Sequence, residues 1–244
     1  MFNRKFLFYL LCMCFSLKVG AQIHSTATVQ NMHLWRGIEV ADGLVLTTDT
    51  YITDKNEHFR FGVWGGTNVT GTYKEFNHYA SYSYKGFSLS FWDTYNFSPG
   101  ASYNNEAYFN YKPRETGRFL DAIVSYRFND KFPLLLNWST IVFGRDRNVD
   151  NTANKYSTFC YVEYPVYCND IWTVDAGVGG AFALNNVIDS SHFYGDKTGI
   201  VHITLKVSKT LNLGEWKIPF FTCATWNPLG DKGFLQIGIQ LFSF

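Results

Sequence analysis

The sequence has 244 residues, of which 19% are aromatic and 17% charged, and its formal net charge is +1 at pH 7. A chain so close to neutral has no basic field of the kind that binds nucleic acid, so we expect no nucleic-acid partner. Its five cysteines match no metal-site spacing and form no disulfide framework. Many aromatic residues, few prolines and low charge favour a β protein.

The first 21 residues have the pattern of a secretory signal peptide. Arg4 and Lys5 precede an apolar run over 6–17, and small residues follow at Gly20 and Ala21. The run is shorter than the ~20 apolar residues that a membrane-spanning helix needs. We predict cleavage after Ala21, which leaves 18 Lys and Arg against 20 Asp and Glu. Three cysteines remain, and we expect them to be structurally incidental: Cys160, Cys168 and Cys223.

From Gln22 onward, apolar and polar side chains alternate in segments of about ten residues separated by turns. Strands with lipid on one side and water on the other alternate in this way. The first six segments are Ser25–Trp35, Leu44–Thr53, Phe59–Gly66, Glu75–Tyr84, a strand from Phe87, and Leu120–Phe128. Six more follow: Leu134–Val142, Tyr156–Val166, Trp172–Gly179, Val201–Ser208, Trp216–Thr225 and a final ribbon from Leu235.

Twelve such segments behind a signal peptide predict a single all-β domain over residues 22–244. In lipid every backbone N–H and C=O must be paired, so a sheet can span a bilayer only by closing on itself. We therefore predict a closed antiparallel transmembrane β-barrel of about 12 strands in the outer membrane of a Gram-negative bacterium.

The links between segments alternate in length. Links after even-numbered segments are short, at 54–57, 85–86, 129–131 and 168–170, with 209–214 somewhat longer. Most links after odd-numbered segments are long, at 99–118, 144–155 and 185–199. Short periplasmic turns and longer extracellular loops are typical of outer-membrane barrels.

The C-terminal ribbon has features of an insertion signal read by the outer-membrane barrel assembly machinery, which we expect as a partner beside outer-membrane lipid. The residues of this predicted signal are Gly238, Phe242 and Phe244. Both phenylalanines share parity with the glutamines of the ribbon rather than with its apolar residues. A bulge near Leu241, or an end of the strand before Phe242, would return them to the lipid side.

Four stretches resemble the TorF-type porins of Bacteroidetes: MHLWRGIEVADG, FRFGVWGGTN, EFNHYASYSYKGFSLSFWDTYNF and DAIVSYRFNDKFPLLLNWSTIVFG. Trp35-Arg36-Gly37, Trp64-Gly65-Gly66 and Asp93 after an aromatic pair carry the match. The resemblance covers nearly the whole mature chain. It implies an outer-membrane β-barrel that forms a pore, and it implies neither a substrate nor catalytic residues.

Alternation places four acids and four bases in the lumen, where a Lys or Arg avoids the ~2–4 kcal/mol cost of facing lipid near the midplane. The predicted lumen residues are Asp49, Asp121, Glu163, Asp175, Arg60, Arg127, Lys206 and Lys217, with His202 nearby. Such a balanced lumen is either a salt-bridged plug or a wet channel with little preference for ion sign. Barrels of eight strands are filled and those of 16 or more are open, so a 12-stranded barrel leaves both interpretations open.

Two residues need separate treatment. Simple alternation puts Asp93 on the lipid side, and we predict that a bulge at Phe91-Trp92 turns it inward, because a lipid-facing acid is costly. Arg36 beside Gly37 is predicted to be solvated or locally paired. Contact of Arg36 with an anionic ligand or lipopolysaccharide is the alternative.

The tryptophans divide between the two faces. Trp138, Trp172 and Trp216 fall on the apolar side, where barrels carry aromatic girdles at both membrane interfaces. Trp64 and Trp92 are the candidates for contact with a ligand in the lumen.

We therefore predict a porin for passive diffusion of small solutes, without cofactor, metal or enzymatic activity. The alternatives are a narrow, plugged barrel with a structural or ligand-binding role, an uptake channel for a hydrophobic or nucleoside-like nutrient, and a barrel enzyme that modifies lipids. For the enzyme the sequence offers only His78 with Ser81 or Ser83, which fall on opposite faces and cannot act together.

Overall fold

The computed structural model describes residues 21–186, 188–214 and 216–243. The predicted signal peptide, apart from Ala21, and the terminal Phe244 lie outside these described residues. Within them the chain forms twelve strands. No helix in the described part of the chain is long and apolar enough to cross a membrane.

The strands follow one another along the chain. They are β1 (Gln22–Trp35), β2 (Ile38–Thr53), β3 (Phe59–Asn68), β4 (Lys74–Tyr84), β5 (Phe87–Asn96), β6 (Arg118–Arg127), β7 (Leu135–Gly144), β8 (Ser157–Cys168), β9 (Trp172–Ala183), β10 (Gly199–Leu213), β11 (Trp216–Asn227) and β12 (Lys232–Ser243).

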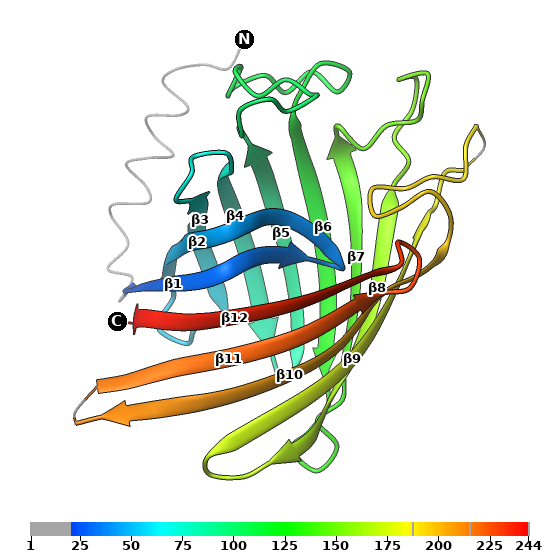
Figure 1. Cartoon of the computed structure of the whole chain (residues 1–244). Helices are drawn as coiled ribbons and strands as arrows, with labels where there is room; N and C mark the ends of the chain where they lie inside the picture. The colour runs from blue at the N-terminus through cyan, green and yellow to red at the C-terminus, as the bar shows by residue number, and fades with distance from the viewer. Residues whose placement is uncertain (1–20, 187, 215, 244) are drawn as a thin grey trace.

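Every strand pairs antiparallel with its neighbours in sequence, and β1 also pairs with β12, so the sheet is a closed barrel (Figure 1). Closure leaves no strand at an open edge of the sheet among the described residues. The strands contain 10 to 16 residues, and a tilted strand needs ~9–11 residues to cross a bilayer. The predicted 12-stranded antiparallel barrel is confirmed.

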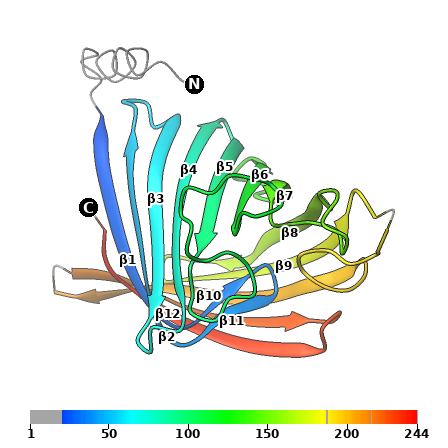
Figure 2. The ribbon, with the colours of Figure 1, turned by 90° about the horizontal axis from the view of Figure 1, so that it is seen from above.

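The two ends of the barrel differ, as the link lengths predicted. The long-loop end carries the segments 97–117, 145–156 and 184–198, and the short-turn end carries the links 54–58, 85–86, 128–134 and 169–171. Figure 2 views the barrel from above, the side of the long loops in Figure 1. One predicted link is wrong: residues 209–213 belong to β10, because pairing continues until Leu213 faces Trp216.

Two hairpins close through two-residue turns of left-handed backbone. Lys85 and Gly86 have φ of 47° and 83°, and Arg36 and Gly37 have φ of 51° and 81°. Turns with positive φ at both central residues match the right-handed twist of paired strands. The second turn directs Arg36 toward the inside of the barrel.

The seam between β1 and β12 contains the predicted bulge. Thr28 pairs with Gln240 and Ala27 with Phe242, so Leu241 is the extra residue. The bulge puts Phe242 on the outer face, where its side chain is 46% exposed. The expectation for Phe242 is confirmed.

The outer face of the wall is apolar and the inner face polar. Cross-strand partners share a face, and Phe59 pairs with Tyr82 while Phe61 pairs with Ala80. The apolar side chains of this face are exposed, with Phe59 at 50% and Phe61 at 54%. Trp138, Trp172 and Trp216 belong to the same exposed outer face.

Candidate functional site

The pairing of the strands assigns a face to every predicted lumen residue. Asp49 pairs with Trp64, Arg60 with Thr53, and Asp121 with Trp92. On the opposite wall, one chain of pairs connects the inward residues Arg127, Leu135, Glu163 and Gly177, and another connects Asp175, Lys206 and Cys223. His202 pairs with Gly179 and Lys217 with Asn212 on the same face. These positions all lie on the inner face, together with Trp64 and Trp92.

Asp93 lies on the outer face, so the prediction that it turns inward is wrong. The ladders of β5 with β4 and β6 continue without a register shift, and Asp93 pairs with His78 and Leu120. The cost of an outward acid is offset by partners that the sequence did not indicate. Arg118 Nη1 lies 2.8 Å from one Asp93 oxygen, and the hydroxyl of Tyr111 donates to the other at 2.6 Å.

The segment 97–117 supplies the cover for this outer site. Tyr108 of that segment accepts from Arg118 Nε through its carbonyl oxygen at 2.7 Å, and its hydroxyl lies 3.1 Å from His78 Nε2. Burial, followed by the hydrogen bond to Asp93, raises the pKa of Tyr111 to about 12. The long loop therefore folds over the outer wall and shields the charges of Asp93 and Arg118.

At the short-turn half of the lumen, charged groups are spread out and partly solvated. Arg127 Nη2 lies 3.1 Å from Glu163, and the Tyr161 hydroxyl contacts both Glu163 and Thr204. The Arg127 side chain is 44% exposed. This pair is the only ion pair within 4.0 Å between two of the eight predicted lumen charges in the described residues.

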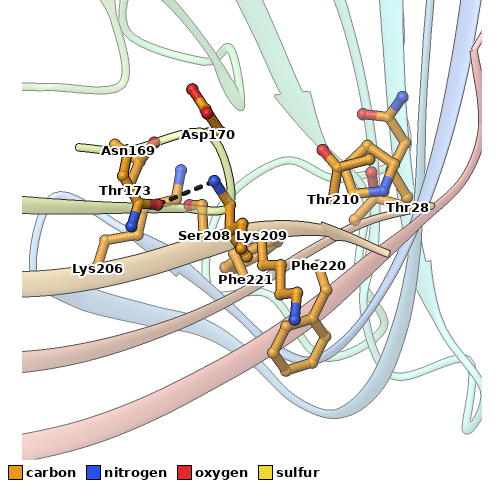
Figure 3. A pocket seen from close by; sticks show the side chains of 13 residues that line it. Thr28, Asn169, Asp170, Thr173, Lys206, Ser208, Lys209, Thr210, Phe220 and Phe221 are labelled. Carbon is orange, nitrogen blue, oxygen red and sulfur yellow. Dashed lines mark hydrogen bonds between the residues drawn. The ribbon is translucent and has the colours of Figure 1, made fainter. Parts of the chain in front are cut away.

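A cavity of about 430 Å³ opens at the same end, among β9, β10, β11 and the turn 169–171. Lys206, Ser208 and Thr173 line it, with Asp170 at the turn (Figure 3). Lys206 faces Asp175 across the ladder without an ion pair within the described chain, and its ammonium lies over the ring of Phe221. Polar groups and open space thus occur together here.

The wall formed by β2–β5 carries a second polar group. The Tyr79 hydroxyl donates to Asp49 at 2.8 Å, and its ring stacks on Trp92 with centroids 4.2 Å apart. The guanidinium of Arg60 lies 4.0 Å from the centroid of Tyr51. These contacts fix the orientation of side chains that border the bore.

Several aromatic rings on the inner face of the barrel lie flat against the wall, each over a glycine of a neighbouring strand. A Cβ on Gly62 would lie 2.5 Å from the Tyr79 ring, and one on Gly179 would lie 2.5 Å from Phe159. The rings of Tyr161 and Phe221 cover Gly177 and Gly238 in the same way. Glycine offers room for a ring to lie down, so these aromatic residues occupy less of the lumen.

The long-loop end is constricted by an inserted segment, residues 188–198. Its Tyr194 is 4% exposed and packs with Phe159, Phe119 and Ile141, which are inward residues of the wall. Phe193 meets the edge of Trp35 with centroids 5.7 Å apart. An apolar cluster therefore narrows this end.

Arg36 is the polar anchor of the constriction. Its guanidinium contacts Asp121 at 2.5 Å and the Tyr194 hydroxyl at 2.6 Å, and it lies 4.7 Å from the centroid of Trp35. Burial would lower its pKa, but Tyr194 and Asp121 outweigh that effect, so the pKa of Arg36 is raised. The prediction of a solvated or locally paired Arg36 is wrong, because its side chain is largely buried and its partners are distant in sequence.

The inserted segment is tied to the neighbouring loop 145–156. Lys155 forms an ion pair with Asp189 at 3.1 Å and a hydrogen bond with Ser191. The backbone N–H of Phe193 donates to Ser157 Oγ at 2.8 Å, and Asp146 accepts from that same hydroxyl. The constriction is therefore held in place by the two loops together.

A larger cavity, of about 500 Å³, lies beside the constriction and was not predicted from the sequence. It is lined by Trp35, Trp64, Trp92, Tyr103, Phe119 and Phe193, together with Glu75, Asn77, Asn96, Asp121 and Arg145. The alternation of the fourth segment could have placed Glu75 inward. Phe193 and Arg145 come from non-repeating loops, which gave no signal in the sequence.

In the described part of the chain, the residues considered for catalysis do not assemble into a site. His78 lies outward beside Tyr108, whereas Ser83 lies on the opposite face and bonds Ser88. Cys160, Cys168 and Cys223 are free thiols. Among the residues that the structure describes, no cluster of three His, Cys, Asp or Glu could hold a metal ion.

Comparison with known proteins gives a distant structural likeness and no match by sequence. No family model matches the chain, and no curated protein matches it. The structure is similar to the crystal structure of an outer membrane channel from Pseudomonas putida F1, with 12% identity, a TM-score of 0.43, and coverage of 92% of this chain and 95% of that chain. A likeness this distant assigns no function.

Proposed function

We propose that the protein is an outer-membrane channel for the passive diffusion of small solutes, exported with a signal peptide over residues 1–21. The long-loop end would face the outside and the short-turn end the periplasm. The resemblance of its motifs to TorF-type porins supports this proposal, as does a barrel whose outer face is apolar.

The proposal rests on the lack of ion-pair partners for most of the predicted lumen charges in the described chain. A salt-bridged plug needs opposite charges in contact, but Asp49, Arg60, Asp175, Lys206 and Lys217 make no ion pair within 4.0 Å in the described chain. Cavities of about 430 Å³ and 500 Å³ lie near the two ends. Unpaired charges beside open space favour water in the bore, because burying an ion without a partner is costly.

Conductance in planar lipid bilayers tests the proposal. We expect the mature chain, refolded in detergent and confirmed by its β spectrum, to give discrete conductance steps. Folded protein that stays silent would contradict the channel and support a plugged barrel. Turnover of phospholipid by the same preparation would support the alternative that the protein is a lipid-modifying enzyme.

Ion preference gives a sharper test of the inward charges. Glu163→Gln should shift the permeability ratio toward anions and Lys206→Gln toward cations, since each removes one charge from the short-turn half of the lumen. Glu115→Gln and Lys112→Gln are matched controls, because that pair lies in a long loop with side chains 56% and 75% exposed. Equal effects of the lumen and loop variants would contradict the wet lumen.

We also propose that Phe242 and Phe244 act with Gly238 as the signal for the barrel assembly machinery. The outward position of Phe242 supports this role. Deletion of residues 242–244 should leave chains in the periplasm of a Gram-negative host, as measured by protease digestion and membrane fractionation. Normal assembly of the truncated chain would exclude the signal.

A further inference from the structure

The cavity of about 500 Å³ at the long-loop end has the size and lining of a ligand site. Pockets for small molecules measure ~300–1,000 Å³ and combine apolar walls with a few placed polar groups. Here Trp35, Trp64 and Trp92 come from three different strands and Phe193 comes from the inserted segment. A solute moving toward the bore from this end meets the cavity beside the constriction.

Two buried polar atoms of the lining have no partner. Asp121 is 2% exposed; its Oδ2 contacts Arg36, and its Oδ1 has no hydrogen bond in the described structure. The Nε of Arg145 is likewise buried and without a partner there. Such groups cost ~1–3 kcal/mol each if nothing satisfies them. Both atoms belong to side chains of the cavity lining, and each exposes less than 1 Å² of its own surface, so a ligand reaches them only where a neighbouring side chain moves aside.

The remaining polar groups leave the cavity electrically balanced. Glu75 accepts from Asn77 at 2.8 Å and from Asn96 at 3.2 Å. The carboxylates of Glu75 and Asp121 are offset by Arg145 and by Arg36, which contacts Asp121. A charged ligand would lose its hydration without gaining a counter-charge, so the balance favours a neutral ligand.

We propose that this cavity binds a neutral saccharide, an inference that rests on the proposed channel function. Each sugar hydroxyl can both donate and accept, so hydroxyls that displace these neighbours can donate to Asp121 Oδ1 and accept from Arg145 Nε. The C–H face of a sugar ring packs against a tryptophan, whose large apolar surface suits it. A purely hydrophobic solute would leave both orphaned atoms unsatisfied.

Binding is measured by isothermal titration calorimetry on the detergent-solubilised mature chain, with glucose and maltose as probes. Uridine, gluconate and glucosamine are the comparison compounds for a nucleoside, an anion and a cation. We expect a neutral sugar to bind more tightly than all three. Tighter binding of uridine, gluconate or glucosamine would overturn the assignment, and so would the absence of binding by both sugars at millimolar concentration.

Variants locate the site. Asp121→Asn retains an acceptor for Arg36 and should weaken sugar binding at least tenfold, because its amide N–H₂ cannot accept a hydroxyl proton. Arg145→Gln should have a similar effect, and it serves as the second variant if the first fails to fold. Trp138→Leu, on the outer face, is the control and should leave binding unchanged. Unchanged binding in both cavity variants would overturn the proposal.

Calorimetry requires no ion flow, so the inference and the channel can fail separately. Sugar binding without conductance would support the site and contradict the channel. Conductance without sugar binding would support the channel and contradict the sugar site. If both hold, adding the sugar should reduce the single-channel current of the unmodified protein but not that of Asp121→Asn.

Discussion

The two ends of the lumen use the same kinds of side chains in opposite ways. At the long-loop end, Arg36 and Asp121 form an ion pair whose side chains are 10% and 3% exposed, enclosed by Trp35 and Tyr194. At the short-turn half, Arg127 and Glu163 form an ion pair whose side chains are 44% and 21% exposed. Each pair joins an arginine to a carboxylate, and the surroundings of the two pairs differ.

The difference in exposure between the two ion pairs distinguishes the constriction at the long-loop end from the solvated short-turn half. A buried ion pair fixes one geometry, because either charge without its partner is strongly disfavoured. A solvated pair exchanges with water and contributes little. We infer that the long-loop end selects solutes by shape and contact, whereas the short-turn half influences ions through its charge.

The largest effect is expected from breaking the buried ion pair of Arg36 and Asp121. Arg36→Met should reduce the free energy of unfolding by ~3–5 kcal/mol, since Asp121 would stay buried without a counter-charge. Arg127→Met should cost only ~0–1 kcal/mol, because that pair is solvated. Urea unfolding in lipid vesicles, followed by tryptophan fluorescence, measures both values.

The double variant Arg36→Met/Asp121→Leu is the control for that loss. Removing both charges should recover much of the stability lost in Arg36→Met. If Arg36→Met and Arg127→Met cost the same, the contrast between the two ends would be wrong.

The second effect concerns the width of the constriction. Phe193→Ala/Tyr194→Ala removes two rings from the inserted segment, and we expect single-channel conductance to rise several-fold because the apolar cluster loses its centre. Phe109→Ala, in the loop 97–117 with a side chain 84% exposed, is the matched control and should leave conductance unchanged. A conductance that does not rise in the double variant would place the narrowest point elsewhere.

Sequence alternation could predict the wall, because the direction of a strand side chain depends on local geometry. Arg127, Glu163 and Lys206 were placed inward from their neighbours alone. Asp93 was misplaced because the cost of an outward acid was weighed without the loop that covers it. Arg118 and Tyr111 offset that cost through contacts made only after residues 97–117 fold back.

The constriction and the larger cavity could not be predicted for the same reason. Phe193, Tyr194 and Arg145 belong to segments without periodicity, and their positions depend on tertiary contacts such as that of Phe193 with Ser157. Arg36, Asp121, Trp64 and Trp92 were singled out one by one from the sequence, but their assembly was not. The partners of Arg36 lie 85 and 158 residues away, a separation that local pattern does not reach.

A smaller effect should follow from disturbing a ring that lies on the wall. A Cβ at Gly238 would overlap the Phe221 ring. Gly238→Ala should therefore push that ring into the short-turn half of the lumen and slightly lower the single-channel conductance. Gly233→Ala is the matched control on the same strand, because nothing lies within 4 Å of a Cβ there. Equal conductance in the two variants would show that the ring does not border the path of ions.

The smallest effect is a response of the constriction to acid. Hydrogen bonds from Ser191 and then Lys155 lower the pKa of Asp189 from 3.8 to about 2. A carboxyl whose pKa is lower in the folded protein stabilises it above its ordinary pKa, and this contribution is lost as pH falls from about 4 to about 2. Conductance should therefore rise slightly over that range as Lys155 releases the inserted segment. Asp189→Asn should show the raised conductance already near pH 6 and no further step; an acid response identical to that of the unmodified chain would mean that other loop contacts hold the segment.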